Sequence, residues 1–241
     1  MWPRERGGRG ERPKLNLQTG ATSADECEVH YSLRLLVILV LLIILGRVAW
    51  EMWHAKSHRP IVASALLVAV GLLGFLEYRA QRAEVFFGQI ATEIAHRDVS
   101  VRCEGLLGSV TNISNHLGYV DFDAGGNPSD TTYLTRDACN WLKEYRGSDR
   151  RVTLNRALGV HTLAHEAVHL QGVTNEAKTE CYGLQQMPRV AEELGASPQE
   201  ARDITTYAFR TLYPQLPSNY RTSECRPGGR LDLSKNDGVW P

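Results

Sequence analysis

Two uninterrupted apolar runs near the N-terminus constrain the fold of this chain more than any other feature. The longer run, Pro60–Leu76, has 17 residues without a charge, and a helix of that length spans roughly 25 Å, close to the thickness of a bilayer core. We therefore predict a transmembrane helix over residues 60–78. The other run, Leu35–Gly46, has 12 residues between two arginines. Runs that short also occur in core helices, but arginines at both ends can reach the bilayer interface, which predicts a second, shorter span over residues 31–50.

Charge is divided unevenly along the 241 residues, although 27 basic side chains balance 27 acidic ones. Residues 1–82 hold 11 basic and 7 acidic side chains, a net +4, and residues 83–241 hold 16 and 20, a net −4. A neutral chain lacks the basic surface that nucleic acids require, so we expect no nucleic-acid partner. Residues 1–30 are rich in arginine, glycine and acidic side chains without periodicity, which predicts a disordered tail. With the two spans, the pattern predicts an integral protein of the cell membrane.

Four of the five cysteines lie in the C-terminal part of the chain, and none belongs to a C-x-x-C pair. An even set without that pair favours two disulfides in an oxidising compartment over a zinc knuckle, with four buried free thiols as the alternative. Of the three possible pairings we favour Cys103–Cys139 with Cys181–Cys225. Together with the predicted spans, these cysteines place the C-terminal domain outside the cytoplasm.

Beyond the apolar runs, the sequence predicts a mainly helical fold with one small β-hairpin. Apolar side chains continue at helical spacing over residues 79–98, which predicts a helical stalk. One domain then occupies residues 99–241. Its hairpin pairs Gly118–Asp123 with Thr131–Thr135 across a glycine-rich turn. Its helices are predicted at residues 136–146, 152–170, 175–194 and 198–212.

One helical turn carries the motif that points to chemistry. His165, Glu166 and His169 form the pattern H-E-x-x-H inside a predicted helix. Residues four apart on a helix project from one face, so the two histidines can share a metal ion. A bound Zn²⁺ lowers the pKa of a coordinated water to about 7, and the glutamate beside the first ligand can take its proton. The motif therefore predicts a zinc site with Glu166 as general base.

Two further carboxylates, Glu176 and Glu180, follow the motif and are again four residues apart. A catalytic zinc takes three protein ligands and keeps one position open. If residues 172–174 form a turn between antiparallel helices, either glutamate can complete a His₂Glu site, and the other can accept the free N–H of a ligand histidine. His161 lies one turn before His165. We expect it at the solvent edge of the helix, with a contact to substrate as the alternative.

Taken together, these residues resemble the gluzincin branch of the zinc metallopeptidases, in which H-E-x-x-H is followed by N-E-x-x-x-D/E. The resemblance implies a zincin-like α+β fold and cleavage of peptide bonds in a peptide or protein substrate, which a hairpin strand aligns by main-chain pairing. Gluzincins usually separate the two motifs by a long stretch, whereas here only six residues separate His169 from Glu176. The residue roles that the resemblance implies are the zinc ligands His165, His169 and Glu176, the base Glu166 and the supporting carboxylate Glu180.

Three functional hypotheses follow from these patterns. The first is a membrane-anchored zinc metallopeptidase that acts outside the cytoplasm. The second is a non-catalytic membrane protein with a structural metal, which predicts a shell closed by four protein ligands. The third is an interaction domain on a membrane stalk, with an accidental motif, and it predicts no bound metal.

Overall fold

The computed structural model describes residues 33–55, 60–104, 116–147, 150–235 and 240. This part of the chain is mainly helical with a small three-stranded mixed sheet, which agrees with the predicted α-rich fold. The predicted tail, residues 1–30, lies outside the described residues.

Both apolar runs form helices. α1 spans Leu33–Ala55 and α2 spans Pro60–Ala95, and the two helices pack against each other. Large apolar side chains such as Ile43 on α1 and Val68 on α2 are exposed. The two runs therefore form a helical pair whose outer faces remain apolar.

The predicted membrane spans need correction. Within the ranges given above, no helix contains a segment that is both long enough and apolar enough to cross a membrane. Charged side chains follow closely on both apolar runs, with Arg47 and Glu51 in α1 and Glu77 in α2. The prediction of transmembrane helices over residues 31–50 and 60–78, and of an integral membrane protein, is therefore wrong.

The sheet has the strand order β1–β3–β2. β1 (Ser100–Cys103) runs parallel to β3 (Pro128–Leu134), and β2 (Gly118–Phe122) runs antiparallel to it. β2 and β3 form the predicted hairpin, with β3 beginning three residues earlier than expected. β1 has no signal in the sequence, because four residues are too few to show an alternating pattern.

Four helices follow the sheet, and a local cap begins each of them. In each case a side chain at the first cap position accepts a backbone N–H three residues on, and α7 begins with a complete capping box. The chain then continues through three short helical turns, η1 (Ala208–Leu212), η2 (Tyr213–Gln215) and η3 (Ser218–Tyr220). The helices are α4 (Arg136–Arg146), α5 (Leu154–His169), α6 (Glu176–Glu193) and α7 (Pro198–Tyr207).

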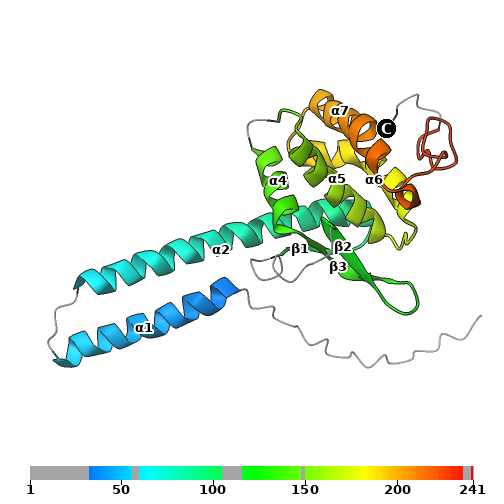
Figure 1. The fold of residues 1–241 in the computed structure, drawn as a ribbon. Coiled ribbons are helices and arrows are strands. Elements are labelled where there is room, and N and C mark those ends of the chain that lie inside the picture. The colour runs from blue at the N-terminus through cyan, green and yellow to red at the C-terminus, as the bar shows by residue number, and fades with distance from the viewer. Residues whose placement is uncertain (1–32, 56–59, 105–115, 148–149, 236–239, 241) are drawn as a thin grey trace, which may run out of the picture. The chain divides into compact units, whose positions relative to one another are not determined.

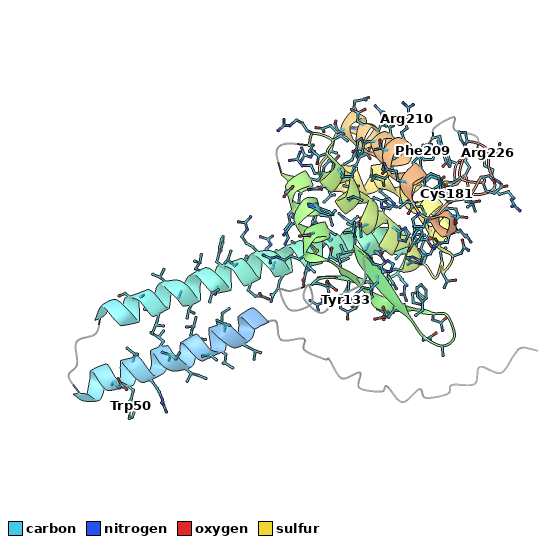
Figure 2. All side chains as sticks on the ribbon, viewed as in Figure 1. Trp50, Tyr133, Cys181, Phe209, Arg210 and Arg226 are labelled. Carbon is cyan, nitrogen blue, oxygen red and sulfur yellow. A yellow bond between two sulfur atoms is a disulfide. The ribbon has the colours of Figure 1, made fainter. Side chains whose placement is uncertain are left out.

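The second half of α2, where the sequence predicts a helical stalk, is helical and packs into the core of the domain. Phe87 and Ile94 are at most 1% exposed, and this part of α2 contacts β1 and α5. Just beyond the helix, Arg97 donates hydrogen bonds to the carboxylate of Asp130 and to the carbonyl of Leu170, which join α2 to β3 and to the end of α5. Figure 1 shows the strands beside this end of α2 with α4–α7 gathered near them, and Figure 2 shows side chains filling the space between these elements.

Both predicted disulfides are present. Cys103–Cys139 joins residues 36 apart in sequence and Cys181–Cys225 joins residues 44 apart. Closing loops of this length removes entropy from the unfolded chain and is worth about 4 kcal/mol for each bond. Because disulfides persist in oxidising compartments, the two bonds are compatible with an extracellular location.

Candidate metal centre

The H-E-x-x-H motif occupies the last turns of α5. The chain leaves the helix at Gly172, whose φ of +88° lies in the left-handed region that favours glycine. Asn175 then caps α6 by accepting the backbone N–H of Lys178. As the spacing predicts, α6 returns along α5, so that residues of the two helices face each other across the turn.

Three side-chain atoms from these helices converge. His165 Nε2 lies 3.0 Å from His169 Nε2, and Glu176 Oε2 lies 3.3 Å from each of them. A tetrahedral ion with bonds of about 2.0–2.1 Å holds its ligands about 3.3–3.4 Å apart. The three atoms, called here the donor triangle, have the size that a small metal ion needs. These buried His and Glu groups could therefore hold a metal ion.

A hydrogen bond holds the other ring nitrogen of each histidine. His169 Nδ1 donates to the carbonyl oxygen of Val173 at 2.7 Å, and His165 Nδ1 donates to Glu180 Oε2 at 3.0 Å. Because a carbonyl only accepts, His169 carries its proton on Nδ1 and directs the lone pair of Nε2 into the donor triangle. The carboxylate of Glu180 orients His165 in the same way. Such bonds orient ligand histidines at metal sites.

The donor triangle requires a positive charge. Glu176 Oε2 is buried without a hydrogen-bond partner in the described chain, and it faces two nitrogen lone pairs. Burial disfavours a charged His165, but when its ring is protonated the hydrogen bonds to Glu176 and Glu180 outweigh burial and raise the pKa of His165 to about 10. When the facing ring nitrogens are protonated, hydrogen bonds from His165 and then from His169 hold the pKa of Glu176 well below its ordinary value. Both shifts have the same cause, since each carboxylate and imidazole stabilises the opposite charge on the other.

Glu180 lies behind the donor triangle and bonds a histidine with each oxygen. His161 Nε2 lies 2.8 Å from its Oε1, and His165 holds its Oε2. Glu180 is 1% exposed. Burial would raise its pKa, but His161 and then His165 outweigh burial and lower the pKa of Glu180 to about 2. His161 is 12% exposed rather than at the solvent edge, where we expected it. Its place on the same helix face as His165 is the sequence signal for this contact.

Glu166 lines the same cavity as the donor triangle. Its side chain is buried, and its Oε2 has no hydrogen-bond partner among the residues placed by the structure. Burial raises the pKa of Glu166 more than the charges of His165 and His169 lower it. The start of β2 makes room for this side chain, because a Cβ on Gly118 would lie 2.9 Å from Glu166 Cγ.

α6 lies close against α5 where Gly183 faces His165. A Cβ on Gly183 would lie 3.1 Å from His165 Cα and 3.2 Å from its backbone nitrogen, tighter than an ordinary contact. The missing side chain therefore lets α6 come near enough for Glu176 and Glu180 to reach the histidines.

A cavity of about 710 Å³ contains the donor triangle and Glu166 in its lining. β2 contributes one part of the lining, and the segment after α7 contributes another. The lining side chains from these two segments are mostly apolar or aromatic. They belong to Tyr119, Val120, Phe122, Leu216, Pro217 and Tyr220.

The segment after α7 is joined to the metal centre at two places. The ring of Tyr220 stacks near the ring of His165, with centroids 6.1 Å apart and planes at 27°. Cys181, labelled in Figure 2, follows Glu180 on α6 and bonds Cys225. Burial, and then the charges of nearby glutamates, raise the pKa of Tyr220 above its ordinary value. Its hydroxyl therefore stays protonated at neutral pH and can donate a hydrogen bond.

The structure brings together every residue that the sequence singled out for metal chemistry: His165, Glu166, His169, Glu176 and Glu180. Comparisons with known protein families, with curated proteins and with solved structures found no match for this chain. Its function is therefore argued from the chemistry of the site itself.

Proposed function

We propose that this chain is a zinc-dependent metallopeptidase with Glu166 as general base. The observation that carries the proposal is the donor triangle of His165, His169 and Glu176 together with the buried Glu166, whose Oε2 has no hydrogen-bond partner in the described part of the chain. Two imidazoles, one carboxylate and an open position form a ligand set of catalytic zinc. We assign Glu176 as the third ligand, because Glu180 faces Nδ1 of His165 and not its Nε2.

The donor set supports a catalytic rather than a structural metal. A structural zinc is usually enclosed by four protein ligands. In the part of the chain that the structure covers, three donor atoms converge, and all three residues line the cavity. Glu180, the candidate for a fourth ligand, bonds His161 and the far side of His165 instead.

A bound zinc ion supplies an acidified water and a positive charge that polarises a substrate carbonyl. The protein supplies the groups that move and orient protons. Glu166 can take a proton at Oε2, which has no hydrogen-bond partner among the described residues. Its raised pKa brings the carboxylate closer to neutral pH, where a general base is most effective. The hydroxyl of Tyr220 lies in the same cavity and can donate to negative charge that develops on a substrate oxygen.

The walls of the cavity favour a peptide as substrate. β2 lies at the edge of the described sheet and lines the cavity. An extended peptide can pair its main chain with such an edge. The apolar lining from Val120, Phe122 and Leu216 suits an apolar side chain of that peptide.

Metal analysis of the purified full chain tests the site. About one zinc per chain is expected, and His165→Ala should lose it. Glu176→Ala should lose more zinc than Glu180→Ala, because the structure turns Glu180 away from the donor triangle. Full zinc content in His165→Ala would overturn the site. Bound iron in place of zinc would overturn the metal assignment, since two histidines and a carboxylate also hold iron.

Cleavage of a peptide library by the zinc-loaded chain tests the activity. Glu166→Gln should keep its zinc, but hydrolysis should fall by on the order of 10²- to 10⁴-fold, the usual contribution of a general base. Glu192→Gln, an exposed position on α6, is the matched control and should cleave normally. Undiminished hydrolysis in Glu166→Gln would refute the role of this carboxylate. Absence of any cleavage by the zinc-loaded chain would refute the peptidase proposal.

A further inference from the structure

We propose that His161 is a positioning residue that acts on the metal centre through Glu180. This inference rests on the metal site of the proposed function and extends it by one layer of residues. His161 has no place in the donor triangle, and its Nε2 is bonded to Glu180. We assign it the task of holding the Glu180 carboxylate in the orientation that His165 requires.

The geometry forms a continuous chain of hydrogen bonds from the cavity to the metal ligand. His161 Nε2 lies 2.8 Å from Glu180 Oε1, and His165 Nδ1 lies 3.0 Å from Glu180 Oε2. The two histidines are one turn apart on α5, and Glu180 reaches them from α6. A carboxylate bonded at both oxygens cannot rotate about its terminal bond without losing one of the two contacts. His161 therefore restricts the rotation of Glu180, and Glu180 in turn fixes the plane of the His165 ring.

Burial makes this contact consequential. Glu180 is 1% exposed, so water cannot readily replace a lost donor. Within the described ranges, His161 is the hydrogen-bond donor to Glu180 Oε1. A buried acceptor left without its donor is costly, and the carboxylate would relieve that loss by turning toward another donor. Such a turn would weaken its bond to His165 and loosen a metal ligand.

His161, His165 and Glu180 also lie close enough together to bind a metal ion of their own. Their hydrogen bonds nevertheless favour a positioning role for His161. A metal there would require the Nδ1 lone pair of His165, whereas that atom carries the proton donated to Glu180. The other nitrogen of His165 belongs to the donor triangle. One neutral imidazole cannot offer both nitrogens as ligands.

The test measures zinc affinity in the full chain by competition with a chelator. His161→Leu removes the donor, and zinc should bind about 10-fold more weakly, at the lower end of the 10- to 100-fold that outer partners of metal ligands contribute. His161→Gln should restore affinity close to that of the unsubstituted chain, because its amide nitrogen reaches the position of Nε2. His161→Asn, whose amide nitrogen is one bond shorter, should behave like His161→Leu. His96→Asn, at an exposed histidine with positive φ that asparagine tolerates, is the matched control and should not change affinity.

Two results would overturn the proposal. One is zinc affinity in His161→Asn equal to that of the unsubstituted chain. The other is equally weak binding in His161→Gln and His161→Asn, which would indicate that the imidazole ring and not its N–H matters. Circular dichroism shows whether His161→Leu folds. If it does not, the zinc affinities of His161→Gln and His161→Asn still test whether the N–H of His161 is needed. Because the readout is zinc binding, failure of Glu166→Gln to lose hydrolysis would refute the proposed function and leave this result unaffected.

Discussion

Replacing Gly183 by alanine has two opposing effects on the free energy of unfolding. Within a helix, alanine is about 1 kcal/mol more favourable than glycine. At this position the new Cβ would lie 3.1 Å from His165 Cα and 3.2 Å from its nitrogen, and these backbone atoms cannot rotate away. α6 would have to move by a few tenths of an ångström to restore an ordinary contact. Overpacking of this kind costs about 1–3 kcal/mol. We therefore expect the free energy of unfolding to fall by about 0–2 kcal/mol.

Gly88→Ala in α2 is the matched control. Its Cβ would lie 3.5 Å or more from the nearest backbone atoms, those of Val99 and of the start of β1, so the gain in helix propensity should appear undiminished. Urea unfolding of the metal-free protein should show the two variants differing by about 1–3 kcal/mol. Because the displaced α6 carries Glu176, Gly183→Ala should also bind zinc more weakly than the control. Equal stabilisation by both substitutions would refute the close approach of the helices, and normal zinc affinity in Gly183→Ala would refute its part in placing the ligand.

Three further outcomes can be measured. Gly118→Ala should slow peptide hydrolysis and leave zinc affinity unchanged, because the new Cβ would displace Glu166 and no metal ligand; a parallel loss of zinc would contradict this. Cys225→Ser should lower the free energy of unfolding by about 4 kcal/mol, since it opens the loop closed by Cys181; an unchanged urea midpoint would speak against it. In the metal-free protein the pKa of His165 is raised from 6.5 to about 10, so its stabilising contribution is complete below pH 6.5 and is lost as the pH rises toward 10. The melting temperature should fall between pH 6.5 and pH 10 in the metal-free protein and stay constant in the zinc-bound protein. The same dependence of melting temperature on pH in both forms would refute the raised pKa of His165.

The helices of the domain could be predicted from the sequence because their signals are local. α4, α5 and α6 lie within two residues of the expected bounds, since caps and apolar periodicity depend on residues a few positions apart. α7 ends five residues early, where the π-helical turn η1 begins. β1 could not be predicted, because so short a strand forms only by pairing with another strand. Its partner β3 lies about 30 residues further along the chain.

The apolar runs show the limit of local patterns. They predicted two helices, and both form, but no helix in the described ranges is long enough and apolar enough to cross a membrane. Crossing a membrane depends on the apolar length of the whole helix and not on one short run. α2 continues past its apolar run to Ala95, and its last turns are part of the core of the domain. The sequence shows that this segment is helical, but only the packing of Phe87 and Ile94 shows what it packs against.

The candidate metal centre also has one part that follows from the sequence and another that depends on packing. The sequence by itself determined that His165 and His169 share one face of a helix, because residues four apart on a helix always do. Their spacing left Glu176 and Glu180 as alternatives for the third ligand, since both were expected on the facing helix, and only the resemblance to gluzincins favoured Glu176. Only the tertiary structure places the two side chains differently: Glu176 Oε2 meets both Nε2 atoms, and Glu180 meets Nδ1 of His165 together with His161. Spacing along a chain cannot set how one helix is rotated against another, whereas the close packing of α6 on α5 at a glycine does.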